Sequence, residues 1–207
     1  MALQIFCATS NEAKLREFRL AAGEEIEISG LPPCDCPENS VTFETNALLK
    51  ALCYSRATMQ AVAGSAKAPL VFADDSGITV DALRGAPGIY SARFAGPNAT
   101  DEANNALLLE RLASIPENQR TGRFVCWIAL VRGSEPIHTF SGQVEGHILT
   151  RPVGSNGFGY DPLFFFPPLG RSFAELTPEE KWKYSHRGQA FRRLLTWLRE
   201  SKETFNS

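Results

Sequence analysis

The sequence lacks a long apolar run and carries no excess of charge of one sign. No stretch reaches the roughly 18 to 20 apolar residues that a membrane-spanning helix requires, and no basic segment followed by an apolar one opens the chain. Lysine and arginine number 21 against 23 acidic residues, a formal net charge of -2, which provides no polybasic surface for a nucleic acid polymer. We therefore expect a cytoplasmic protein that binds neither a membrane nor a nucleic acid polymer.

Two common nucleotide-binding motifs are also absent. The chain contains neither GxGxxG nor GxxxxGK[ST], which argues against a dinucleotide-binding fold and a P-loop. Cysteine is scarce and odd in number, at five residues. Cys7, Cys53 and Cys126 lie in apolar stretches, which indicates buried thiols in a reducing compartment. Cys34 and Cys36 have no second Cys or His pair, so we expect loop thiols and no zinc site there.

The proportions of hydrophobic and charged residues are those of an ordinary globular protein. At 207 residues, with 43% hydrophobic and 21% charged, it can bury a substantial core. Short strand-like runs alternate with helical patterns. The second half holds two β-rich runs, Arg123 to Arg132 and Ile137 to Leu149, joined by Gly133-Ser134 as a hairpin turn. This alternation predicts a single α/β domain over residues 1–207 with a mixed sheet.

Capping residues predict where several helices begin and end. One follows the strand-like run at the amino terminus, starts at Thr9-Ser10-Asn11, which are residues that favour helix N-caps, and ends at Gly23. A second is capped by Thr42 and runs to about Met59. The last begins after Ser185 and carries an apolar face.

The first segment with chemical potential is the turn before the first helix. It reads Thr9-Ser10-Asn11-Glu12-Ala13-Lys14. This turn puts two hydroxyls, free backbone N–H groups and an ammonium at the positive end of a helix, and these are the groups that bind phosphate. The simpler alternative is an ordinary capped helix with an exposed lysine.

A pair of acids follows the apolar run Leu70 to Ala73. Asp74 and Asp75 then lie where one strand ends, before Ile78 to Val80 resumes extended character. Magnesium prefers one or two carboxylates together with substrate phosphates, so this pair is a candidate metal site. Adjacent acids at a strand end are also common turn formers.

Two further segments combine aromatic, glycine and polar residues. In the loop Gly154 to Pro162, Phe158 and Tyr160 lie among glycines beside Asp161, which suits close folding around a flat ligand with a ring stacked on it. The alternative is that both rings pack into the core.

The second of these segments precedes the last helix. Lys181, Ser185, His186 and Arg187 form either a solvated basic turn or a set of donors around the edge of a base.

Together these segments resemble the inosine triphosphate pyrophosphatase family, which hydrolyses deaminated purine nucleoside triphosphates to the monophosphate and pyrophosphate. The resemblance covers nearly the whole chain, and its five segments, in order, are ATSNEAKLREF, TFETNALLKA, FADDSGITVDALRGAPGIYSARFAG, GSNGFGYDPLFF and ELTPEEKWKYSHRGQAF. It implies an elongated two-lobed α/β fold, with a central mixed β-sheet flanked by helices and the active site in the inter-lobe cleft. It also implies Mg²⁺ as cofactor and a homodimer.

The resemblance assigns roles residue by residue. Asp75 matches the acid that holds Mg²⁺ and serves as general base for water, and Asp74 supports it. Lys50 matches a helix lysine near the phosphates. The positions that match substrate-binding residues are Thr9, Ser10, Asn11, Glu12, Ala13, Lys14, Lys50, Ser76, Phe158, Gly159, Tyr160, Asp161, Lys181, His186 and Arg187.

One departure concerns the second metal ligand. The family commonly reads F-x-E-N-A, whereas Thr45 stands here at the glutamate position and the acid, Glu44, comes one residue earlier. A shift of one residue turns a helical side chain by about 100°. Glu44 is the candidate substitute as metal ligand. Two other functions remain open: a nucleotide-binding protein that has lost turnover through this change, and a pyrimidine triphosphate pyrophosphatase of related fold.

Overall fold

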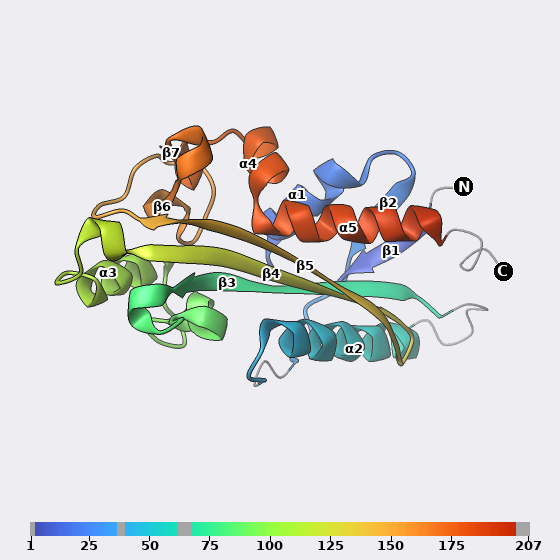
Figure 1. The fold of residues 1–207 in the computed structure, drawn as a ribbon. Helices are drawn as coiled ribbons and strands as arrows, with labels where there is room; N and C mark the ends of the chain where they lie inside the picture. The colour runs from blue at the N-terminus through green and yellow to red at the C-terminus, as the bar shows by residue number, and fades with distance from the viewer. Residues whose placement is uncertain (1–2, 37–39, 62–67, 202–207) are drawn as a thin grey trace. The chain divides into compact units, whose positions relative to one another are not determined.

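The protein, described by a computed structural model over residues 3–36, 40–61 and 68–201, is built around one β-sheet (Figure 1). The strands are β1 Leu3–Cys7, β2 Ile26–Gly30, β3 Leu70–Val80, β4 Thr121–Arg132, β5 Glu135–Ile148, β6 Phe164–Phe166 and β7 Arg171–Ser172. The α-helices are α1 Glu12–Ala22, α2 Phe43–Ala61, α3 Asp101–Arg111, α4 Pro178–Tyr184 and α5 His186–Glu200.

The sheet is mixed, with strand order β2-β1-β3-β4-β5-β6-β7. β1 pairs in parallel with β2 and β3, while β6 pairs antiparallel with β5 and β7. β4 and β5 are neighbours joined by only two residues, which requires an antiparallel hairpin. The predicted α/β fold with a mixed sheet is therefore confirmed. None of the helices in the described ranges is long and apolar enough to cross a membrane.

The chain divides into two compact units. The first comprises Met1–Asp75, Cys126–Ser141 and Gln189–Ser207, and the second comprises Ser76–Val125 and Gly142–Gly188. β3, β4 and β5 each contribute residues to both units. Along β3 the division falls between the consecutive residues Asp75 and Ser76.

The core of the first unit covers both faces of β3. Val71 and Ala73 belong to a cluster with the buried face of α2. Phe72, which lies between them in sequence, contacts Phe18 of α1 and Phe191 of α5 at ring-centroid distances of 5.1 and 5.6 Å. Side chains alternate along a strand, so α2 lies on one face and α1 and α5 on the other (Figure 1).

The core of the second unit packs α3 against the sheet. Leu108 of α3 and Leu112, which directly follows the helix, are fully buried in it. The other members are Ile78, Val80, Phe124, Val144, Ile148, Tyr160, Leu163, Phe164, Phe166, Phe173 and Leu176. This core supports the loop before β6 and the turn before α5, which carry candidate site residues.

The predicted helix boundaries are largely confirmed. α1 ends at Gly23, whose φ of 69° is in the left-handed region that favours glycine. The Thr42 hydroxyl accepts from the Thr45 N–H at the start of α2, and the Ser185 hydroxyl accepts from the Gly188 N–H at the start of α5. The sequence analysis missed α4, a helix of 7 residues that begins with a capping box at Thr177.

The prediction that two strands meet at the acid pair is wrong. β3 runs without a break from Leu70 to Val80, through both aspartates. The Asp74 side chain is fully buried, and the Lys14 ammonium lies 2.9 Å from its Oδ2. This ion pair compensates the buried charge, so the turn preference of aspartate does not end the strand.

The expectation for Cys53 is also wrong. Cys53 is only partly buried on α2, and it forms a disulfide with Cys36 in the segment that follows β2. The apolar residues around Cys53 suggested burial, but they cover the other side of the helix. Cys7 and Cys126 are buried, as expected, and neither forms a disulfide.

Candidate functional site

The turn before α1 is fixed by its own side chains. Asn11 is the N-cap of α1, and its Oδ1 accepts from the N–H groups of Ala13 and Lys14 at 3.0 and 3.1 Å. The N–H of Asn11 donates to the Thr9 hydroxyl, which is buried, whereas Ser10 is exposed. The positive end of α1 therefore presents a preorganised turn.

Two lysines from different helices converge on Asp74. Lys14 Nζ of α1 donates to Asp74 Oδ2 at 2.9 Å, and Lys50 Nζ of α2 lies 3.5 Å from the backbone oxygen of the same residue. The structure thus places two ammonium groups beside the acid pair of β3. Ammonium groups donate to phosphate oxygens, so the two lysines are candidates for binding a phosphate group.

The catalytic candidate, Asp75, is held by a residue that the sequence analysis did not assign. Asn46 Nδ2 donates to Asp75 Oδ2 at 3.1 Å, while Asn46 Oδ1 accepts from the Ser40 N–H. Asn46 is buried, and Asp75 is partly exposed. The sequence does contain a sign of this role, because Asn46 stands at the asparagine position of the F-x-E-N-A pattern.

Glu44 and Thr45 point to different partners at the start of α2. Glu44 Oε1 accepts from the hydroxyl of Thr139 in β5 at 2.7 Å. Thr45 is exposed, and its hydroxyl bonds to that of Thr42 in the helix cap. Glu44 is thus held by a hydroxyl on β5.

In the second unit a buried ion pair shapes the glycine-rich loop. Lys181 Nζ of α4 lies 2.6 Å from Asp161 Oδ2, and this oxygen also accepts from the Phe158 N–H at 2.9 Å. A Cβ on Gly157, whose φ is 78°, would overlap the Asp161 carboxylate. Glycine at this position therefore lets the loop close over the ion pair.

Two positively charged side chains lie near the ring of Phe158. Lys181 Nζ lies 4.4 Å and the Arg187 guanidinium carbon 5.3 Å from the ring centroid, distances at which cation–π attraction acts. Arg187 also donates to the Ser76 hydroxyl at 3.0 Å. The structure thus brings Ser76, Phe158, Lys181 and Arg187 together, although they lie far apart in the sequence.

The donors from the end of α4 to the start of α5 do not form a solvated turn. Lys181, Ser185, His186 and Arg187 are all buried, with exposed fractions of 2 to 6%. His186 stacks on Phe124 of β4, with ring centroids 4.8 Å apart and planes 10° apart. Burying charged groups is costly unless they are paired, so this cluster indicates a site and not a surface turn.

A cavity of about 410 Å³ borders the same loop. It lies between α3 and the loop that includes Phe158, and Asp101 and Asn105 of α3 line it. Asp101 accepts from the Gly159 N–H, and Asn105 donates to the Gly159 carbonyl oxygen. The size is in the range of small-molecule sites, but the acidic lining disfavours the phosphate end of a nucleotide.

Tyr160 packs into the core, which was the alternative to stacking on a flat ligand. It is buried in the second unit, and its hydroxyl donates to the Ser91 carbonyl oxygen at 2.8 Å. Burial raises the pKa of the Tyr160 phenol above its usual value, and the negative charge of Asp101 adds to this effect. Tyr160 therefore positions the loop and presents no stacking face.

Tyr160→Phe is expected to lower the free energy of unfolding by about 1–3 kcal/mol near pH 7, because the Ser91 carbonyl loses its donor. Above about pH 10 the unfolded phenol loses its proton while the folded one keeps it, so the parent loses stability as the pH rises. The difference between parent and variant should shrink there. Urea unfolding at both pH values tests this, and a constant difference would contradict it.

Comparison with known proteins gives matches over nearly the whole chain. A model of the Ham1 family matches residues 5–197. The dITP/XTP pyrophosphatase of Exiguobacterium sibiricum is 46% identical over 197 residues, which cover 93% of this chain and 95% of that protein. A solved HAM1 protein from Coxiella burnetii is 39% identical with a TM-score of 0.82, covering 96% of this chain and 99% of that one. A solved dITP/XTP pyrophosphatase from Mycobacterium abscessus is 40% identical with a TM-score of 0.70, covering 93% and 99%.

Proposed function

The chain belongs to the Ham1 family, and on this basis we propose that it hydrolyses inosine, deoxyinosine and xanthosine triphosphates to the nucleoside monophosphate and pyrophosphate. Water attacks the α-phosphorus, and the bond from that phosphorus to the α,β-bridging oxygen breaks. The observation that carries the proposal is the similarity to dITP/XTP pyrophosphatases along almost the full length of both chains. The biological effect is removal of deaminated purines from the nucleotide pool.

The acid pair and the two lysines of the first unit serve the phosphates. Asp75 accepts the proton of the attacking water, and Asn46 fixes its carboxylate through the 3.1 Å hydrogen bond. Lys14, Lys50 and the amino-terminal end of α1 neutralise charge on the departing pyrophosphate. Preorganised donors of this kind commonly contribute about 3–4 kcal/mol each to the transition state.

The residues present also fit a magnesium ion. Asp75 would hold it, with Glu44 as second ligand, since Mg²⁺ prefers one or two carboxylates together with substrate phosphates. The partly exposed carboxylate of Asp75, held by Asn46 Nδ2, supplies the hard oxygen donor that this requires. When bound, the ion neutralises phosphate charge.

Selection of the base is assigned to the second unit. The 6-position of hypoxanthine and xanthine is a carbonyl acceptor, whereas that of adenine is an amino donor. Arg187 supplies a buried donor beside the ring of Phe158, on which the base stacks, and His186 supplies a second buried donor. A site built around such a hydrogen bond rejects the wrong partner by about 10⁴-fold or more, because adenine leaves the donor unpaired.

We propose the oligomeric state of the protein and its cellular location on the basis of the same family membership. We expect a homodimer in the cytoplasm, where the nucleoside triphosphate pool is used. Light scattering of the purified full chain tests the first expectation, and a mass of one chain would contradict it.

Asn46→Ala is expected to lower magnesium affinity or activity by about 10–100-fold, because removing the partner of a metal-binding carboxylate typically costs that much. Magnesium titrations of the rate of inosine triphosphate hydrolysis measure this effect. Leu49→Ala is the matched control, since Leu49 is an exposed residue on the same helix. Equal magnesium dependence in both variants would contradict the role of Asn46.

Product analysis tests the position of cleavage. Equal amounts of inosine monophosphate and pyrophosphate support the proposal. Release of orthophosphate with inosine diphosphate contradicts it.

A further inference from the structure

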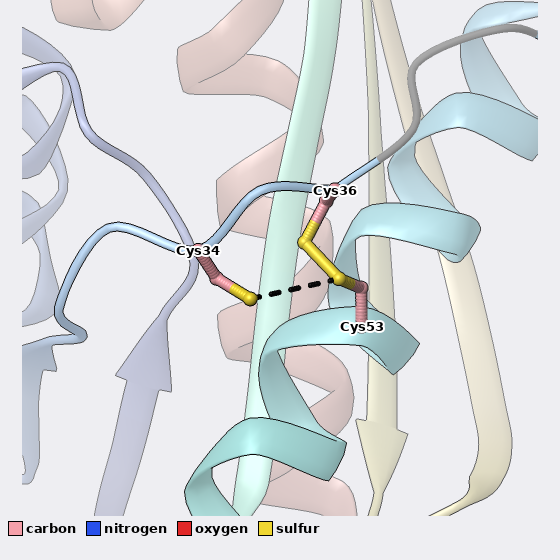
Figure 2. Close-up of side chains that lie close together, drawn as sticks. All are labelled: Cys34, Cys36 and Cys53. Atoms are coloured by element: carbon pink, nitrogen blue, oxygen red, sulfur yellow. Dashed lines mark hydrogen bonds between the residues drawn. A yellow bond between two sulfur atoms is a disulfide. The ribbon is translucent and has the colours of Figure 1, made fainter.

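Three cysteines of the first unit lie close together. Cys34 and Cys36 lie in the segment after β2, and Cys53 comes from α2 (Figure 2). Their sulfur atoms all lie within 4.8 Å of one another. Cys36 and Cys53 form a disulfide, and Cys34 Sγ lies 3.8 Å from Cys53 Sγ. All three are partly exposed, so a ligand can reach them from solvent.

The geometry suits a thiolate metal site in the reduced protein. Two sulfurs bound to one tetrahedral zinc ion at about 2.3 Å are about 3.8 Å apart. This is the separation of the Cys34 and Cys53 sulfurs. Rotation about the Cα–Cβ bond of Cys36 brings its sulfur to the same centre once the disulfide opens, because the Cα atoms of Cys36 and Cys53 are only 6.0 Å apart.

The Cys36–Cys53 disulfide involves only two of the three sulfurs, so it does not explain why Cys34 lies beside them. In a reducing compartment disulfides do not persist, so the three thiols would stand together. The Cys-x-Cys spacing supplies two ligands from one short segment, and the third comes from a helix that packs in the core. Soft thiolates select zinc or Cu(I) over magnesium, so this site and the acid pair take different ions.

We propose that the reduced Cys34, Cys36 and Cys53 bind one soft metal ion, with Zn²⁺ as the favoured ion, and that the disulfide is the metal-free oxidised form. A dithiol reductant gives two electrons and two protons to the Cys36–Cys53 disulfide and becomes a disulfide itself. Each of the three thiols then loses its proton as it forms a sulfur–metal bond. Water or a solute completes the fourth position, as the partial exposure of the cluster allows.

The bound ion ties the segment after β2 to α2. Cys53 lies three residues beyond Lys50, on nearly the same side of the helix. Metal binding is therefore expected to stabilise the first unit, since a ligand that binds only the folded state raises the apparent stability. The inference does not depend on the proposed function.

Metal titration of the reduced full-length protein tests the proposal. The protein is reduced, freed of reductant under nitrogen, and titrated with Zn²⁺ and Co²⁺. We expect one zinc ion per chain by elemental analysis, sulfur-to-cobalt charge-transfer absorption, and a rise in the melting temperature. Cys34→Ser should lose binding at equimolar zinc, whereas Cys126→Ala, which removes a buried thiol elsewhere, should keep it.

Oxidation supplies a second comparison that needs no substitution. The same wild-type protein with the Cys36–Cys53 disulfide formed is expected to bind no zinc at equimolar concentration. Two results would overturn the proposal: reduced wild type that binds no zinc, or Cys34→Ser that binds as well as wild type. The second would leave only an ordinary disulfide pair.

Discussion

Asp75→Asn is expected to abolish hydrolysis while sparing the fold. The amide has the same shape and can still accept from Asn46 Nδ2, but it cannot take a proton from water. Loss of a general base alone typically costs about 10²–10⁴-fold in rate, and loss of a metal ligand adds to this. Pyrophosphate release from inosine triphosphate at saturating magnesium measures the effect.

Asp81→Asn is the matched control for this substitution. Asp81 follows the same strand, but its carboxylate is exposed and pairs with Arg123. This variant should retain the parent rate. If Asp75→Asn turned over at the parent rate with unchanged circular dichroism, the assignment of Asp75 would be wrong.

Lys181→Met is expected to lower the free energy of unfolding by about 3–5 kcal/mol, because it leaves the Asp161 carboxylate buried without its cation. The exposed fractions of the two side chains are 8% and 4%, so solvent cannot replace the ammonium. The loop at Phe158 should loosen as well, since the same oxygen holds the Phe158 N–H. Urea unfolding midpoints give the loss.

Two further variants separate the charge from the packing. Lys181→Met combined with Asp161→Asn should lose less than Lys181→Met alone, because no unpaired charge remains. Arg171→Met breaks an exposed pair with Glu180 and should leave the midpoint nearly unchanged. If Lys181→Met cost no more than Arg171→Met, the ion pair would not stabilise the second unit.

Local signals predicted the elements whose ends are decided locally. The hydroxyls of Thr42 and Ser185 accept from backbone N–H groups three residues on, and Gly23 adopts a positive φ, so the starts of two helices and the end of a third could be predicted from the sequence. β3 could not be read in this way. The buried charge of Asp74 in this strand is paired with Lys14, which lies 60 residues away, and a sequence window shows no such contact.

In the candidate site, too, some features could be predicted from the sequence and others depend on contacts between distant residues. The resemblance named the residues, but not which of them meet. Contacts such as Lys181 with Asp161 and Arg187 with Ser76 join distant segments, and they decide that the donors before α5 are buried. Asn46 was visible in its motif and was missed, because a neutral amide carries no obvious chemistry until its contact with Asp75 is seen.

The cysteines were misjudged for a related reason. Cys34 and Cys36 looked isolated because their third partner, Cys53, lies 17 residues beyond Cys36 on a helix. Only the packing of α2 brings it to them.

The most direct test of the proposed function is pyrophosphate release from a panel of nucleoside triphosphates. Inosine, xanthosine, adenosine, guanosine and pyrimidine triphosphates are each assayed with magnesium and with chelator. We predict magnesium-dependent release confined to the inosine and xanthosine nucleotides. Binding without release from any of them would contradict the account and indicate an inactive nucleotide-binding protein, with Thr45 as the reason, and release confined to pyrimidine nucleotides would contradict the assigned base selectivity.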